Sequence, residues 1–92
     1  MIERRVLITN RLGLHARAAA LLVRTASGFQ SVIRLERADG SASADAKSIL
    51  SVLMLAASRG TELRATAEGP DENEAIEALC SLIGNGFGET EK

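Results

Sequence analysis

Aromatic side chains are scarce in this sequence, which contains two Phe and neither Trp nor Tyr. Proteins that bind single-stranded nucleic acids stack the bases on such rings, so the sequence gives this class little support. The 11 Lys and Arg residues are offset by 12 Asp and Glu residues, which leaves a formal charge of -1 and no basic excess for a phosphate backbone. We therefore expect no nucleic-acid partner.

Cysteine and histidine each occur once, as Cys80 and His15. A single cysteine excludes an internal disulfide, and a single histidine excludes the usual zinc sites, which combine several Cys and His ligands. No apolar run approaches the roughly 18 residues of a membrane span, and the N-terminal residues lack the apolar core of a secretory signal. We expect a cytoplasmic protein that does not insert into a membrane and that uses neither a metal nor a cofactor.

The chain is short, with 92 residues, which is enough for one domain. A chain of this size buries only about 60–65% of the surface that it exposes when unfolded, so it has no room for a deep substrate cavity beside its core. The function must then lie on the surface or in one or two reactive side chains. We expect one domain over residues 1–92, with a core across 2–87 and a flexible C-terminal tail, and a monomer.

The distribution of apolar residues predicts four short strands and three helices in the order β-α-β-β-α-β-α. The expected strands lie at 5–9, 33–36, 41–44 and 61–68, and the expected helices lie at 16–27, 48–57 and across 75–83. Asp71 and Glu74 have the spacing of a capping box before the last helix. This order predicts an α+β fold with the helices on one face of a mainly antiparallel sheet.

His15 stands directly between a Gly13-Leu14 loop and the helix that begins at Ala16, so we expect it at or beside the N-cap. The first helical turn offers free backbone N–H groups and the positive end of the helix dipole, which together bind anions. Arg17 adds a guanidinium group that suits phosphate. Positive surroundings favour the neutral imidazole, whose lone pair can attack a phosphoryl group. The alternative is a structural one, in which His15 only caps the helix and Arg17 is solvated.

The helix expected at 48–57 is apolar on almost every side, and it includes Ile49, Leu50 and Leu53. One helix on a small domain cannot bury every face, and an exposed apolar patch often marks a docking surface. A non-catalytic regulatory protein that docks through these three residues is therefore an alternative to a phosphoryl carrier. A small-ligand-binding domain is a third class, which the lack of room for an enclosed pocket disfavours.

Two segments resemble the motifs of one known family. The segment 10–19, Asn-Arg-Leu-Gly-Leu-His-Ala-Arg-Ala-Ala, is similar to the active-site signature of the HPr family, and 46–53, Ala-Lys-Ser-Ile-Leu-Ser-Val-Leu, is similar to the regulatory-serine helix of that family. HPr proteins are the histidine phosphocarriers of the bacterial phosphoenolpyruvate-dependent phosphotransferase system. The resemblance covers residues 2–87, and it implies an open-faced β-sandwich.

The resemblance implies a role for each motif residue. Enzyme I, charged by phosphoenolpyruvate, would donate a phosphoryl group to Nδ1 of His15. Arg17 would stabilise the group, and His15 would pass it to an IIA-type acceptor. Such a protein is a relay within a phosphotransferase system and not an independent turnover enzyme. The docking surface of the family matches Ala20, Arg24, Ile49, Leu50 and Leu53.

Ser48 has two interpretations. A serine at a helix N-cap stabilises the helix by about 0.5–2 kcal/mol and needs no further role. The resemblance implies that it is also phosphorylated, in some bacteria, by HPr kinase/phosphorylase. The sequence departs from many family members at Ala18, where they have proline. The alanine-rich run after His15 resembles the nitrogen-related (NPr) branch more than the sugar-transport branch.

Overall fold

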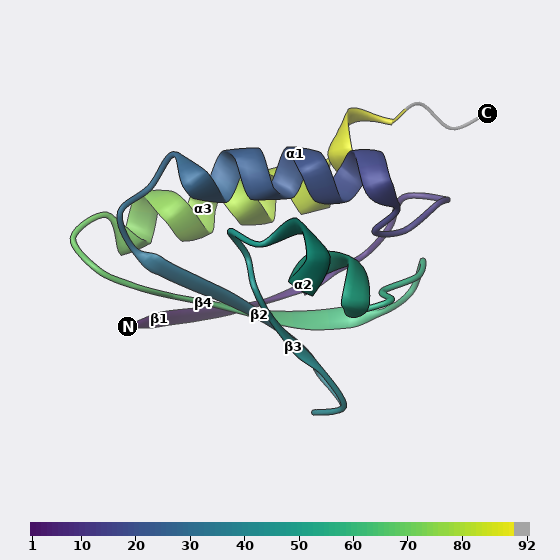
Figure 1. Cartoon of the computed structure of the whole chain (residues 1–92), viewed down its shortest axis with the longest axis horizontal. Helices are drawn as coiled ribbons and strands as arrows, with labels where there is room; N and C mark the ends of the chain where they lie inside the picture. Colours follow the sequence, from purple (N-terminus) through teal and green to yellow (C-terminus); the bar gives the residue numbers. More distant parts are fainter. Residues whose placement is uncertain (90–92) are drawn as a thin grey trace.

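Residues 1–89, which the computed structural model describes, form one four-stranded sheet with three α-helices on one of its faces (Figure 1). The elements are β1 (Ile2–Leu7), α1 (Ala16–Ser27), β2 (Val32–Arg37), β3 (Ser43–Asp45), α2 (Ile49–Met54), β4 (Glu62–Glu68), α3 (Glu72–Gly84) and a 3-10 turn, η1 (Gly86–Gly88). The predicted α+β architecture, an open-faced β-sandwich, is confirmed. No helix among these residues is long and apolar enough to cross a membrane.

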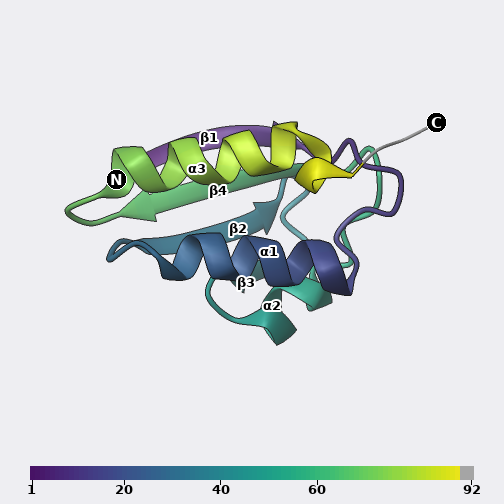
Figure 2. The same ribbon diagram turned by 90° about the horizontal axis from the view of Figure 1, so that it is seen from above.

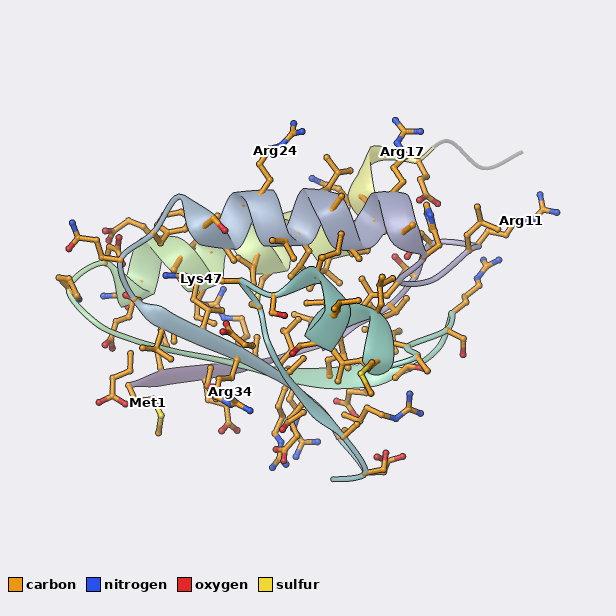
Figure 3. All side chains as sticks on the ribbon, viewed as in Figure 1. Met1, Arg11, Arg17, Arg24, Arg34 and Lys47 are labelled. Carbon is orange, nitrogen blue, oxygen red and sulfur yellow. The ribbon has the colours of Figure 1, made fainter. Side chains whose placement is uncertain are left out.

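The strands pair in the spatial order β1-β4-β2-β3, and every pair is antiparallel. The residues of β4 alternate between the two faces of the sheet: Leu63, Ala65 and Ala67 are buried under the helices, and the residues between them face the open side. Figure 2 shows α3 over β1 and β4, and α1 over β2. Arg34 of β2 extends from the open side of the sheet, away from the helices (Figure 3).

The helices bury faces that are rich in alanine. On α1 the buried residues are Ala18, Ala19, Leu22 and Ala26, which share one face of the helix. Short side chains let the helix lie close to the sheet, where Ala65 is also buried. This close packing fixes the start of α1, and with it His15, relative to the rest of the domain.

β1 begins earlier than predicted, since it spans Ile2–Leu7 and not 5–9. Consecutive charged residues hide its alternation in the sequence. An edge strand accommodates them, because its side chains reach partners on neighbouring elements. Arg4 contacts Glu77 of α3 at 3.4 Å, and Arg5 contacts Glu62 of β4 at 3.6 Å.

α2 is shorter than predicted, because it ends at Met54 and does not reach 57. The chain turns at Ala56, which has a φ of 51°. The guanidinium group of Arg37 donates to the carbonyl oxygens of Leu55 at 3.0 Å and of Ala56 at 3.3 Å. This contact from β2 satisfies carbonyl groups at the end of α2, and helical spacing alone cannot reveal it.

α3 begins without the predicted capping box, so that prediction is wrong. Asp71 occupies the N-cap, but its carboxylate accepts from the backbone of Gln30 at 2.8 Å and from the backbone and hydroxyl of Ser31 at 2.9 and 2.5 Å. The hydroxyl of Ser31, helped by the backbone donors, lowers the pKa of Asp71 below its ordinary value. The side chain that contacts the preceding loop is that of Glu72, which accepts from Gly69 N at 3.1 Å.

The chain folds back after α3 instead of leaving the domain at Gly84. The turn η1 follows, and Phe87 is buried there with a φ of 58°. Glu89 then reaches the start of α1. Residues 90–92, which belong to the expected tail, lie outside the described residues.

Candidate functional site

His15 is the N-cap residue of α1, as the sequence predicts. Its side chain makes no capping bond, and the first backbone bond of the helix runs from Ala19 N to His15 O at 2.8 Å. Within residues 1–89, the amides of Ala16, Arg17 and Ala18 therefore have no acceptor. The His15 side chain is 27% exposed, so the ring is partly accessible beside three free donors at the positive end of a helix.

The loop before His15 is held by backbone contacts that require glycine at position 13. Gly13 has a φ of +65°, and a Cβ there would lie 2.6 Å from Ala57 O. Leu14 N donates to the same carbonyl at 2.8 Å, and His15 N donates to Gly13 O at 2.9 Å. The loop thus rests against the segment that follows α2, and this contact sets the direction in which His15 enters the helix.

Two further residues reach this site: Glu89, which lies outside both sequence motifs, and Asn10, which is part of the segment 10–19 but had no predicted role. Oε2 of Glu89 lies 2.5 Å from Nε2 of His15. Nδ2 of Asn10 donates to Oε1 of Glu89 at 3.2 Å and to Gly13 O at 2.8 Å. Asn10 is buried, with 2% of its surface exposed, so it is a fixed link between the loop and the C-terminal segment.

The hydrogen bond from His15 lowers the pKa of Glu89 below its ordinary value, and Asn10 and the charge of Arg17 act in the same direction. Glu89 lies 74 positions from His15 in the chain. Phe87, two positions before Glu89, is buried in the core, and an aromatic residue at this place is the one sequence signal that the chain stays on the domain after α3.

Exposed arginine side chains lie on the loop before His15 and at both ends of α1. Figure 3 shows Arg11, Arg17 and Arg24 extending outward from the loop and from α1. All three are exposed, and none forms an ion pair with another described residue. Arg17 stands in the first turn, as predicted, and the remaining two extend the positive surface along the chain.

The predicted docking residues lie on α1 and α2, two helices that pack side by side (Figure 2). Ala20, Arg24, Ile49 and Leu50 are exposed, and Leu50 is 71% exposed, whereas Leu53 is half-buried against the core. Met54, 79% exposed, lies on the same short helix and was not among the predicted residues. We call Ala20, Arg24, Ile49, Leu50, Leu53 and Met54 the α1–α2 surface.

Ser48 is the N-cap of α2, at the edge of the α1–α2 surface. Its hydroxyl oxygen accepts from Ser51 N at 3.4 Å, which fits its structural interpretation.

Comparisons with known proteins agree with the site. A family model described as the PTS HPr component phosphorylation site matches residues 2–85. The chain is 47% identical to phosphocarrier protein HPr of Cupriavidus necator over 99% of this chain and 100% of that protein. It is 38% identical to phosphocarrier protein NPr of Escherichia coli over 96% of this chain and 97% of that protein.

Solved structures give the same result for the fold. The crystal structure of HPr from Thermoanaerobacter tengcongensis matches with a TM-score of 0.92 and 46% identity, covering 99% of this chain and 100% of that one. HPr from Bacillus anthracis matches with a TM-score of 0.83 and 39% identity, covering 89% and 95%. The chain therefore belongs to the HPr family, the phosphocarrier proteins of the phosphotransferase system.

Proposed function

We propose that this protein accepts a phosphoryl group on His15 from phosphorylated enzyme I and passes it to an IIA-type acceptor. The observation that supports this most directly is the partly exposed imidazole beside the unbonded amides of Ala16, Arg17 and Ala18. An anionic phosphoryl group attached to the ring would face these donors. The Arg17 side chain, in the same turn, supplies positive charge.

The site suits a group that is held briefly. The end of a helix stabilises a negative charge by about 0.3–2 kcal/mol, and a hydrogen bond to a charged group contributes about 1.5–3 kcal/mol. Together these interactions are enough to favour the phosphorylated form without preventing transfer to the next protein. The exposed position of the ring also lets two successive partners approach the same atom.

The partners would bind the α1–α2 surface. Its apolar residues, Leu50 and Met54 above all, are exposed on α2, which packs beside the helix that carries Arg17 and Arg24. This combination fits a partner with an apolar centre and an acidic rim, since opposite charges speed encounter. Interfaces of such transient complexes are small, so we expect modest affinities.

Ser48 would offer a means of regulation, with HPr kinase/phosphorylase as the modifying enzyme. A phosphate on its oxygen would replace the bond from Ser51 N and add negative charge at the edge of the α1–α2 surface. An acidic partner would then bind less well. Phosphorylation of this serine in a cell extract, lost in Ser48→Ala, would support this role.

The acceptor belongs either to sugar transport or to the nitrogen-related branch, and both place the protein in the cytoplasm. Transfer from the phosphorylated protein to a sugar-type IIA and to a nitrogen-type IIA, measured side by side, distinguishes them. The faster transfer identifies the branch.

The central experiment is incubation with enzyme I and labelled phosphoenolpyruvate. We expect an adduct that is acid-labile and base-stable, which is typical of phosphohistidine, and we expect His15→Ala to abolish it. Arg17→Ala should slow its formation. Circular dichroism of both variants checks that they fold. Undiminished labelling of a folded His15→Ala variant would show that the proposal is wrong.

The exposure of Leu50 also favours a second candidate, a regulatory protein that acts by docking alone. Under this alternative, His15→Ala keeps the cellular function and Leu50→Glu loses it. Under the carrier proposal, both variants lose it.

A further inference from the structure

We propose that Glu89 is a positioning residue that holds the proton of His15 on Nε2 and so leaves Nδ1 as the nucleophilic atom. This inference rests on the proposed phosphoryl-carrier function and adds to it a residue outside both sequence motifs. It starts from the contact of 2.5 Å between Oε2 of Glu89 and Nε2 of His15.

The choice of ring atom follows from the chemistry of the contact. An ionised carboxylate has lone pairs and no proton, so it only accepts hydrogen bonds. Its neighbours keep Glu89 ionised at neutral pH. Nε2 must then be the donor, and in a neutral ring the single remaining lone pair is on Nδ1. No group within residues 1–89 donates a hydrogen bond to Nδ1, so this lone pair is free.

The carboxylate also covers the atom that does not react. With Oε2 in contact, Nε2 has neither a lone pair nor an open approach for a phosphoryl group. Attack is limited to the other nitrogen of the ring, so the position of Glu89 selects the reacting atom as well as the protonation of the ring.

Glu89 is itself held in place by a buried residue. Its second oxygen, Oε1, accepts from Nδ2 of Asn10, and the same amide group donates to Gly13 O. The Asn10 side chain therefore fixes both the loop before His15 and the Glu89 carboxylate that contacts Nε2 of the ring. An acidic residue near the end of the chain thereby acquires a defined orientation toward the imidazole.

The transfer step gains from this arrangement in both directions. Nδ1 attacks the phosphorus of the phosphohistidine in enzyme I, a new N–P bond forms, and the N–P bond to the donor breaks. The ring of His15 keeps its proton on Nε2 and becomes positively charged, and the Glu89 carboxylate offsets this charge. When the group leaves for the acceptor, the protonated ring is the better leaving group, and the neutral ring returns with the same proton.

Nitrogen NMR of the unphosphorylated protein, labelled at histidine, tests the inference directly. At neutral pH we expect the neutral ring of the wild type to carry its proton on Nε2. Glu89→Ala should give a mixture of the two tautomers, and Glu89→Gln should show a weaker preference for Nε2 than the wild type, because its single amide oxygen cannot accept from both Nε2 of His15 and Nδ2 of Asn10. Retention of the full wild-type preference for Nε2 in Glu89→Ala would overturn the inference.

Kinetics of phosphorylation by enzyme I provide the second measurement. Glu89→Ala should react about tenfold more slowly, as expected for the loss of one hydrogen bond to a charged group. Glu89→Gln should lie between this variant and the wild type, because its amide oxygen can accept from Nε2 only when it does not accept from Asn10, and it lacks the charge. The matched control is Glu77→Ala, which removes an exposed glutamate of α3 that pairs with Arg4 of β1 and does not contact His15. This variant should change neither the NMR spectrum of His15 nor the rate of phosphorylation.

The two proposals can fail separately. If His15→Ala is still labelled, the carrier function itself is wrong. If His15→Ala is unlabelled and Glu89→Ala has the spectrum and rate of the wild type, the carrier function stands and the role of Glu89 is wrong.

Discussion

The N-termini of α1 and α3 are built from similar parts and carry opposite charges. Each helix follows a glycine in the left-handed region, Gly13 before α1 and Gly69 before α3. The first turn of α3 contains two glutamates, Glu72 and Glu74, after an aspartate at the N-cap. The first turn of α1 contains no acidic residue and carries Arg17.

The difference separates a structural helix start from one that is available for a ligand. At α3 the protein supplies its own negative charge, and the carboxylate of Asp71 is occupied by donors from residues 30 and 31. At α1 the Glu89 carboxylate is bonded to the His15 ring and to Asn10, and the unbonded amides of the first turn are left to an incoming group. A positive helix end marks a candidate site only where the chain has not already neutralised it.

The variant with the largest expected effect places in the first turn of α1 a negative charge like that in the first turn of α3. Ala16→Glu places a glutamate at the first helical position, where α3 has Glu72. We expect phosphorylation by enzyme I to slow at least about tenfold, because like charges near 4 Å repel by about 1–4 kcal/mol between bulk water and a protein surface. Thermal stability should stay the same or rise slightly, since acidic residues suit a helix N-terminus.

Ala16→Gln is the matched control, because it adds a side chain of the same length without the charge. It should be phosphorylated at nearly the rate of the wild type. A similar loss of rate in both variants would mean that the size of the side chain, and not its charge, blocks the site.

The two glycines provide the next test. Gly13→Ala and Gly69→Ala should each lower the free energy of unfolding by at least about 2 kcal/mol, because each combines an unfavourable φ with a clash of the new Cβ. Only Gly13→Ala should also impair phosphorylation, since it displaces the loop before His15. Gly40→Ala, with a φ of +77° and open space around it, should cost less than either in a denaturant titration. Equal rates for the first two variants would remove the functional distinction between the two helix starts.

Asp71→Asn tests the contribution of the N-cap of α3 to stability, and it leaves the start of α1 unchanged. Hydrogen bonds, first from the Ser31 hydroxyl, hold the pKa of folded Asp71 below its ordinary value of 3.8. The stability that this carboxylate contributes is therefore present above pH 3.8 and is lost as the pH falls through the folded-state pKa. The variant should have a lower Tm than the wild type at pH 7, and the difference should shrink as the pH falls below 3.8. Phosphorylation should be unaffected, and a constant Tm difference from pH 7 to pH 2.5 would contradict the assignment.

The same comparison explains which features could be predicted from the sequence. The position of His15 at the start of α1 was predictable, because a glycine loop followed by strong helix formers is a local signal. The position of Asp71 was predictable too, but its partners were not, since Gln30 and Ser31 lie about 40 positions away and donate largely through backbone atoms. Local spacing suggested a capping box, and a contact across the fold replaced it.

The residues of the candidate site also fall into those that the sequence could predict and those that it could not. His15 and Arg17 are two residues apart, so one motif contains both. Asn10 and Glu89 meet at His15 only because η1 returns the chain to the start of α1, and no pattern of spacing encodes that return. The bounds of β1 and α2 were predicted wrongly for a related reason. The charged side chains of β1 depend on partners on neighbouring elements, and the end of α2 depends on the guanidinium group of Arg37, which comes from β2.

The smallest expected effect concerns Ala18, where many family members have proline. Proline lacks an N–H group, and Ala18 N has no acceptor within the described chain, so Ala18→Pro breaks no bond of the helix. Proline makes the unfolded chain less flexible, which stabilises the folded variant, but it disfavours the helical conformation of Arg17 before it. We therefore expect the free energy of unfolding to change by less than about 1 kcal/mol.

The Ala18→Pro variant removes one of the three amides that face the proposed phosphoryl position. Phosphorylation should therefore slow by about two- to tenfold, the equivalent of one ordinary hydrogen bond. An unchanged rate in a stopped-flow assay would show that Ala18 N does not bind the phosphoryl group. The amides of Ala16 and Arg17 and the Arg17 side chain would then bind it alone, and the functional difference between α1 and α3 would lie in the first two positions of each helix.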